Sequence, residues 1–163
     1  MSATASHASP QSMSPHLLPS TAHSYLERSV TSLHDAITAR DVPTRYACAH
    51  VAALCAAAAL LAARARPAPR GRRQKNAWVL LAEVAPELSE WASFFAAGAS
   101  KRAAAEAGST RAVTEREADD LVRDSDRFLA VVEQALGLVP HARLSDRVVP
   151  HVPTGAGRVS GVA

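Results

Sequence analysis

The chain has 163 residues, which fits one domain with tails. Hydrophobic residues make up 48% of it but aromatic residues only 4%, so an alanine-rich core must gain stability from close backbone approach rather than from bulky side chains. The formal net charge of +3 is a mild cationic bias. The sequence contains none of the patterns GxGxxG, GxxxxGK[ST], HExxH and CxxC, which are the common motifs of nucleotide-binding proteins, zinc proteases and redox proteins.

Both ends of the chain are predicted to be disordered tails. Residues 1–22 are rich in Ser, Ala, Pro and His and carry almost no charge, and residues 138–163 contain Pro, Gly and Val without periodicity. The first stretch has neither a basic n-region nor an apolar h-region, so we do not interpret it as a secretory signal. The ordered domain is expected over residues 23–137, and it is expected to be entirely helical.

The first helix is predicted over residues 23–40. Leu26, Val30, Leu33 and Ile37 recur at helical spacing within it, so these four side chains are expected to form one apolar stripe that faces the core.

The second helix is predicted over residues 44–65, which include the alanine-packed run RYACAHVAALCAAAALLAARA. Pro43 fits its first turn, and Pro67 and Pro69 end it. The run is long enough to suggest a membrane-spanning helix, but it is mostly alanine and contains His50. We therefore expect a buried core helix and no contact with a membrane.

The two cysteines, Cys48 and Cys55, both lie on this helix, seven positions apart. That spacing separates their Cα atoms by about 10 Å along the helix axis, which is too far for a disulfide. They are expected to be small apolar side chains in a reducing cytoplasm.

A third helical segment is predicted over residues 74–107, with a break or kink at Pro86 and a stop at Gly108. Four aromatic side chains recur along it at helical spacing, and we interpret them as core residues rather than as a ligand box: Trp78, Trp91, Phe94 and Phe95.

The fourth helix has the clearest start signal, because Thr114 and Glu117 have the spacing of a capping box. Gly137 marks its end. Its predicted apolar stripe is Ala118, Leu121, Val122, Ser125, Phe128, Leu129, Val132 and Leu136. Together the segments predict an all-α fold, an up-and-down bundle of four to five helices.

Acidic residues cluster early in the fourth helix, at Asp119, Asp120, Asp124 and Asp126. A metal site or an acid–base pair is one interpretation. The favoured one is a solvated face, because acids near a helix N-terminus complement its dipole and here alternate with arginines. The seven histidines make no metal-ligand spacing with a cysteine or with one another, so we expect no metal and no cofactor.

A basic loop follows the second helix and contains no acidic residue. A Pro- and Gly-rich loop lets several cationic side chains reach different phosphates, so RNA or DNA is one expected partner. A solvated connector is the alternative, and no interleaved aromatic residue supports base stacking. The residues proposed to bind nucleic acid are Arg70, Arg72, Arg73 and Lys75.

Three segments resemble the HEPN superfamily, and within it a small stand-alone actinobacterial family, the SAV-type. They are RYACAHVAA at 45–53, NAWVLLAEVAPELSEWASFFAAGASKRAAAEAG at 76–108 and TEREADDLVRDSDRFLAVVEQALG at 114–137. The resemblance covers residues 23–137. It implies a helical bundle that commonly forms a homodimer, in a superfamily many of whose members act on or bind RNA or nucleotides.

Active HEPN ribonucleases carry an arginine followed, after four to six residues, by a histidine, usually in a later helix. Arg45 and His50 have this spacing, and so do Arg28 and His34, but residues 74–136 contain no histidine. Five residues turn an α-helix by about 140°, so Arg45 and His50 would not share a face. We interpret His50 as a core or interface histidine rather than as a catalytic base.

Three functions follow. The first is a non-catalytic, dimeric HEPN-like bundle that binds nucleic acid or a protein partner. The second is a metal-independent ribonuclease with a composite dimer site that uses Arg45 and His50. The third is a structural or interaction protein with no role in nucleic-acid binding. The missing histidine in the later helices disfavours the second, and the basic loop favours the first over the third.

Overall fold

The computed structural model describes residues 18–65 and 75–147. Within these ranges every regular element is helical, which confirms the predicted all-α fold. The elements are α1 (Ser20–Thr38), α2 (Val42–Arg64), α3 (Ala77–Val84), the 3₁₀ turn η2 (Pro86–Leu88), α4 (Ser89–Ala97), α5 (Ala99–Glu106), α6 (Glu115–Ala135) and the 3₁₀ turn η3 (Leu144–Arg147).

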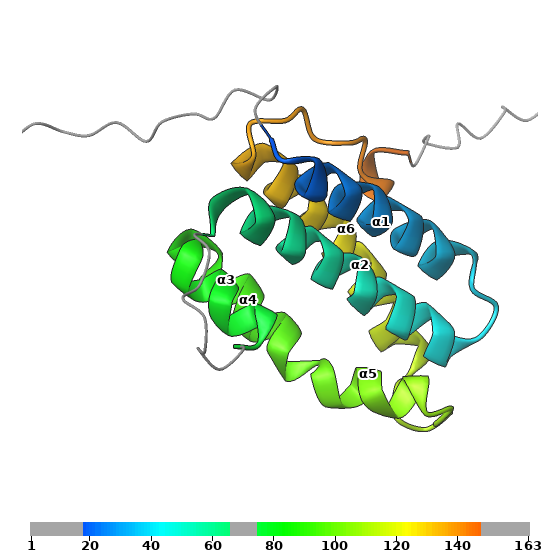
Figure 1. The fold of residues 1–163 in the computed structure, drawn as a ribbon. Coiled ribbons are helices and arrows are strands. Elements are labelled where there is room, and N and C mark those ends of the chain that lie inside the picture. The colour runs from blue at the N-terminus through cyan, green and yellow to red at the C-terminus, as the bar shows by residue number, and fades with distance from the viewer. Residues whose placement is uncertain (1–17, 66–74, 148–163) are drawn as a thin grey trace, which may run out of the picture.

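Helix α2 is the central helix of the bundle. It packs against α1 on one side, against α3 and α5 on the other, and against α6 behind it (Figure 1). Among the described residues it is the one helix long and apolar enough to cross a membrane, and 56% of its most apolar window is buried inside the bundle. Both faces therefore serve packing, as predicted for a core helix.

Small side chains decide which face of α1 is buried. Val30 and Ile37 are 49% and 45% exposed, so the predicted stripe is only half right. Ser29 is buried instead and donates a hydrogen bond of 2.8 Å to the Ala52 carbonyl of α2. Close approach to the alanine face of α2 selects the smallest residues of α1. The buried face consists of Ala22, Leu26, Ser29, Leu33 and Ala36.

A local cap sets the start of α2. The Asp41 carboxylate accepts a hydrogen bond of 2.8 Å from the Thr44 backbone N–H, and Pro43 lies in the first turn as predicted. The thiols of Cys48 and Cys55 are free, also as predicted.

The third segment is more divided than its sequence indicates. Pro86 breaks it as predicted, but Gly98 then separates α4 from α5. A Cβ atom at Gly98 would lie 3.0 Å from the Tyr46 hydroxyl oxygen, so a larger residue here would require the Tyr46 side chain to shift. Gly108 has φ +83° at the predicted end of the segment.

Helix α6 begins at the predicted capping box. The Glu117 N–H donates to the Thr114 hydroxyl, and the Glu117 carboxylate accepts from the Thr114 N–H. Every residue of the predicted apolar stripe is buried, and Gly137 ends the helix with φ +75°.

The ordered part extends beyond both predicted boundaries. Helix α1 begins at Ser20 and Leu18 is buried, so the predicted first tail is wrong over residues 18–22. Residues 138–147 are also placed against the bundle and end in η3, because buried carboxylates of α6 bind their backbone. The remainder of both predicted tails, residues 1–17 and 148–163, lies outside the described residues.

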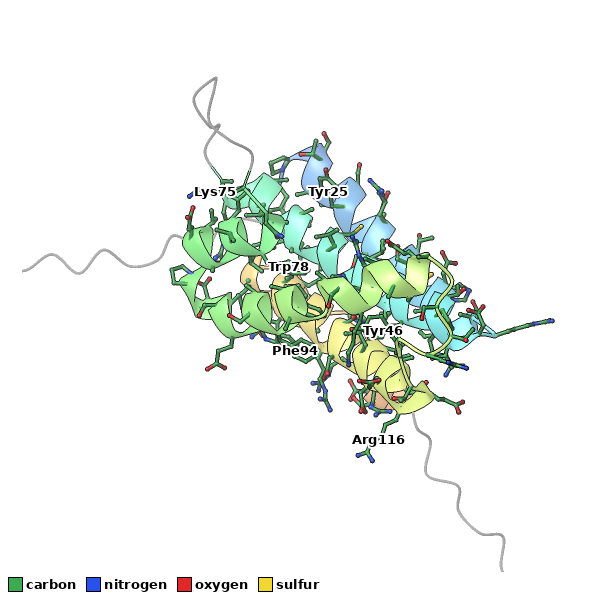
Figure 2. The ribbon with its side chains drawn as sticks, turned by 90° about the horizontal axis from the view of Figure 1, so that it is seen from below. Tyr25, Tyr46, Lys75, Trp78, Phe94 and Arg116 are labelled. Atoms are coloured by element: carbon green, nitrogen blue, oxygen red, sulfur yellow. The ribbon has the colours of Figure 1, made fainter. Side chains whose placement is uncertain are left out.

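An aromatic cluster fills the space between α2, α3, α4 and α6. Phe95 is fully buried, stacks on Trp78 at a centroid distance of 5.2 Å and lies 5.1 Å from Phe128. Trp91 is half-buried and packs against the core, whereas Phe94 is 47% exposed, so the prediction of a core position is wrong for Phe94. Figure 2 shows Trp78 within the bundle and Arg116 pointing into solvent.

Candidate functional site

Arg45 joins α2 to α6. Its guanidinium Nη1 lies 2.6 Å from Oδ1 of Asp119 and 3.9 Å from Oε1 of Glu115. Its side chain is only 19% exposed. The guanidinium is therefore occupied by carboxylates of its own chain rather than presented to a substrate.

His50 is buried in the aromatic cluster, with 1% of its surface exposed. Its Nε2 lies 3.0 Å from the Phe95 carbonyl oxygen, and its ring meets those of Trp78 and Phe95 edge-on at 5.9 and 6.0 Å. Burial lowers the pKa of His50 below its ordinary value, an effect that the hydrogen bond to Phe95 only partly offsets. The ring is neutral and out of reach of solvent.

Neither of the two arginine–histidine pairs with ribonuclease-like spacing is therefore brought together within the chain. Arg45 points toward α6 while His50 points toward α3 and α4. In the other pair, Arg28 and His34 are both exposed on α1, and the Arg28 guanidinium lies 5.9 Å from the ring centroid of Tyr25. Six residues turn a helix by about 240°, which places Arg28 and His34 on different sides.

The basic loop lies largely outside the described residues. This is the case for Arg70, Arg72 and Arg73. Lys75 is described, and its ammonium lies 2.5 Å from a carboxylate oxygen of Glu83.

The acidic cluster of α6 is a solvated face at three of its four positions. Asp119 pairs with Arg45, Asp120 with Arg123, and Asp124 with Arg127. Asp126 is the exception, since it is only 3% exposed and bonds to the chain beyond α6. The described residues contain no group of three potential metal ligands.

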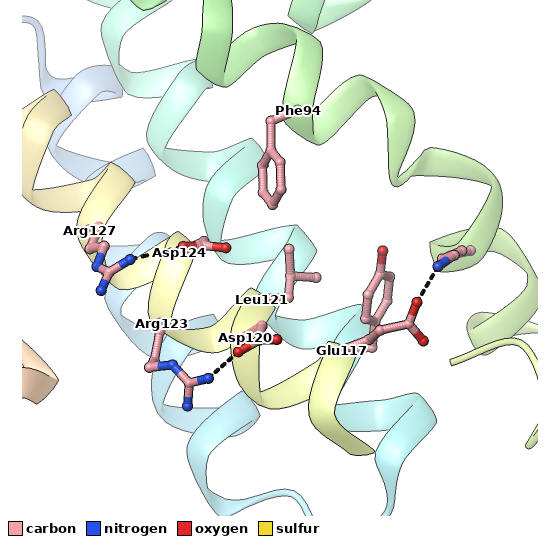
Figure 3. Close-up of a pocket in the computed structure, with 9 residues that line it drawn as sticks. Phe94, Glu117, Asp120, Leu121, Arg123, Asp124 and Arg127 are labelled. Atoms are coloured by element: carbon pink, nitrogen blue, oxygen red, sulfur yellow. Dashed lines mark hydrogen bonds and ion pairs between the residues drawn. The ribbon is translucent and has the colours of Figure 1, made fainter. Parts of the chain in front are cut away.

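The surface between α4, α5 and α6 contains a groove, which we call the α4–α6 groove. It consists of two adjoining hollows of about 370 and 330 Å³ that share Phe94 and Asp124. Phe94 stands on α4 across from the ion pairs of α6 (Figure 3). The groove is lined by Tyr46, Glu90, Trp91, Phe94, Lys101, Glu117, Asp120, Leu121, Arg123, Asp124 and Arg127.

Charges in this groove nearly cancel. Its lining holds three cationic side chains and four carboxylates, and most of them pair across one helical turn. At one end the Lys101 ammonium bonds to Glu117, and this bond, together with the donors of Thr114, lowers the pKa of Glu117 to about 2. A polyanion gains no net electrostatic attraction from a surface whose charges cancel. A protein surface that itself carries charges of both signs does gain attraction, because its charges can pair with those of the groove.

The sequence analysis missed one buried polar site, around His141. Its imidazole lies between the carboxylates of Asp126 and Glu133, at 2.9 and 2.8 Å. A signal was present, because Asp126 and Glu133 are seven residues apart on the apolar side of α6, where an unpaired carboxylate would be costly.

A family model described as SAV_6107-like HEPN matches residues 36–133. The comparisons with curated proteins and with solved structures found no match. The matched range exceeds half of the chain and runs from the end of α1 almost to the end of α6, which confirms the resemblance found in the sequence. The chain therefore belongs to the SAV_6107-like HEPN family.

Proposed function

We propose that this HEPN domain is a non-catalytic binding module that forms a homodimer through the α4–α6 groove. The position of His50 supports the non-catalytic part. A general base must come within hydrogen-bond reach of the proton it removes, yet His50 is 1% exposed and its Nε2 is occupied by the Phe95 carbonyl. Arg45, its partner by spacing, is engaged with Asp119.

The exposed aromatic side chain of Phe94 supports the choice of the groove as the interface. Phe94 is 47% exposed and its ring meets the half-buried Trp91 at 6.3 Å, so a partner could bury both. Aromatic residues of this kind are enriched at the centres of protein interfaces.

The charge pattern of α6 supports a second copy of the chain as the occupant. Asp120 and Asp124 alternate with Arg123 and Arg127 along the groove. In an isologous interface, residue i contacts j and j contacts i, so an alternating row can place each carboxylate opposite a guanidinium of the partner. The near-neutral lining also avoids like-charge repulsion between copies.

Sedimentation of the full chain tests this interface. At micromolar concentration we expect twice the monomer mass, and Phe94→Glu should return the mass to that of a monomer. Val79→Glu is the matched control, because Val79 is 50% exposed on α3 and does not line the groove. A wild-type monomer, or equal loss of the dimer in both variants, would refute the proposed interface.

Incubation of the purified protein with RNA tests the non-catalytic part. We expect no cleavage without metal, and any residual cleavage should persist in His50→Ala, since a contaminant does not depend on that residue. Cleavage that disappears in a folded His50→Ala variant would favour the ribonuclease instead.

Nucleic-acid binding, if present, is proposed to use the basic loop rather than the groove. The loop contains no acid in its sequence. Its last cation, Lys75, is paired with Glu83, so the three loop arginines, Arg70, Arg72 and Arg73, are the expected phosphate contacts. Replacing these three with Gln should flatten the dependence of log K on log[salt] by about 2 units on single strands, while Lys75→Gln should change it little.

A further inference from the structure

The chain beyond α6 folds back onto the bundle. We call residues 138–147 the C-terminal strap. Its backbone is held at two points, because the His141 N–H donates to Oε2 of Glu133 at 2.8 Å and the Leu144 N–H donates to Oδ2 of Asp126 at 3.0 Å. Both acceptors belong to buried side chains of α6.

The His141 ring completes the attachment. Its Nδ1 lies 2.8 Å from Oε2 of Glu133 and its Nε2 lies 2.9 Å from Oδ1 of Asp126. Two ionised carboxylates would only accept hydrogen bonds, so both ring nitrogens would donate, and only the imidazolium carries two ring N–H groups. In that state one positive charge stands between two buried carboxylates.

The other charged groups near this ring are already paired or lie further out. Arg127 of α6 pairs with Asp124, and Arg143 of the strap pairs with Asp146. From α1 the neighbouring titratable group is His34, which lines the hollow beside the strap. Trp91, the neighbour from α4, carries no charge. Burial alone would lower the pKa of His141, but the hydrogen bonds and charges of Asp126 and Glu133 outweigh it and raise that pKa above its ordinary value.

The strap forms one side of a hollow between α1 and α6 that is partly open to solvent. This hollow has a volume of about 190 Å³, and Leu144 of the strap packs against the core beside it. Val30 and Ile37, the two exposed aliphatic residues of α1, are part of its wall. Release of the strap would enlarge the exposed part of this aliphatic wall, which consists of Val30, Leu33, Ile37 and Leu129.

We propose that residues 138–147 form a pH-dependent strap, which is docked along the α1–α6 hollow while His141 is an imidazolium clamped by Asp126 and Glu133, and which detaches when the ring loses its proton. Deprotonation removes one hydrogen-bond donor and leaves two buried carboxylates without a counter-charge, which is costly. The docked state is fully favoured below about pH 6.5, the ordinary value for histidine, and is lost as the pH rises through the raised pKa of the clamped ring.

The protonation state can be observed directly in the full chain. Ring ¹⁵N NMR at pH 6 should show both nitrogens of His141 protonated. A neutral ring with one protonated nitrogen, facing a protonated carboxyl group, would overturn the proposal.

Detachment of the strap can be followed by amide hydrogen exchange, corrected for the intrinsic rate at each pH. The reporters are the N–H groups of His141 and Leu144, which are bonded only in the docked strap. Their protection should fall by up to about tenfold per pH unit between the ordinary and the raised pKa, while amides within α6 stay protected. Unchanged protection of both reporters from pH 6 to 9 would refute the switch.

Variants separate the clamp from simple packing. His141→Gln keeps a hydrogen-bonding amide but no charge, so protection of Leu144 should be low and independent of pH. The double variant Asp126→Asn, Glu133→Gln should also lose the pH response. His34→Gln is the matched control, because His34 lines the hollow without bonding to the clamp, and it should respond as the wild type does. A pH response that persists in His141→Gln would assign the switch to another group.

Discussion

The guanidinium of Arg45 and the carboxylate of Asp119 meet at 2.6 Å, although 74 residues separate them in sequence. The contact joins the N-terminal parts of α2 and α6, the two helices with the most buried residues. The arginine that a ribonuclease motif would require is thus a structural cross-link, and its energetic role can be measured.

Removing Arg45 should lower the stability of the folded chain. The pair is partly buried on the arginine side, at 19% exposure, so a double-mutant cycle of Arg45→Ala and Asp119→Ala should give a coupling of about 0.5–1 kcal/mol in urea unfolding. Arg116→Ala is the control. That side chain is 91% exposed, and its loss should change stability by less than about 0.5 kcal/mol. Coupling near zero would mean that water already solvates the contact.

Adding a methyl group at Gly98 should destabilise the fold through Tyr46. The backbone at Gly98 has φ −80°, which any residue adopts, so alanine gains up to about 1 kcal/mol of helix propensity. The new Cβ would lie 3.0 Å from the Tyr46 hydroxyl oxygen, and overpacking of this kind costs about 1–3 kcal/mol.

Urea unfolding in two backgrounds isolates this clash. Gly98→Ala should destabilise the wild type, but in Tyr46→Phe, where the hydroxyl is absent, it should be neutral or stabilising. Equal costs in both backgrounds would show that the contact is not the cause.

The buried His50 should make the protein less stable in mild acid. Since burial lowers its pKa in the folded state, the unfolded chain binds the proton more readily. The contribution of the neutral His50 to the free energy of unfolding is fully present above about pH 6.5. It is lost as the pH falls toward the lowered pKa, by up to about 1.4 kcal/mol per pH unit.

His141 titrates with the opposite sign, so the measurement belongs in a His141→Gln background. Urea unfolding between pH 5 and 8 should show a decline on the acid side that becomes shallower when His50→Leu is added. The slope of the unfolding free energy against pH is the quantity to compare, because His50→Leu also loses the hydrogen bond to Phe95 and so changes the stability at every pH. A slope that does not change would mean that His50 is protonated equally in both states.

The parts of the fold that depend on local signals were predictable from sequence. Helix α6 carries its own caps at Thr114, Glu117 and Gly137 and a strong 3.6-residue period, so its ends and every residue of its predicted apolar stripe were correct. The face of α1 was not, because hydrophobicity ranks Val30 and Ile37 above Ala22 and Ser29. Packing against the alanines of α2 reverses that order by favouring small side chains.

The candidate sites depend on contacts between segments that are distant in the sequence, and the spacing of residues along one segment does not predict such contacts. The tight contact at Gly98 is with Tyr46, which lies on a different helix. The strap depends on His141 meeting Asp126 and Glu133, which is visible only once α6 is known to bury two carboxylates. Helical geometry alone sets Arg45 and His50 on different faces, and in the structure Arg45 contacts Asp119 while His50 contacts Phe95.

The alanines along α2 also determine where this protein tolerates redesign. Positions such as Ala49, Ala53 and Ala56 have no exposed surface, and neighbouring helices approach them closely. Larger residues there would push α1 and α6 outward together. A mutagenesis library aimed at greater thermal stability should therefore hold α2 fixed and vary the outer faces of the bundle, where added bulk meets solvent instead of a second helix.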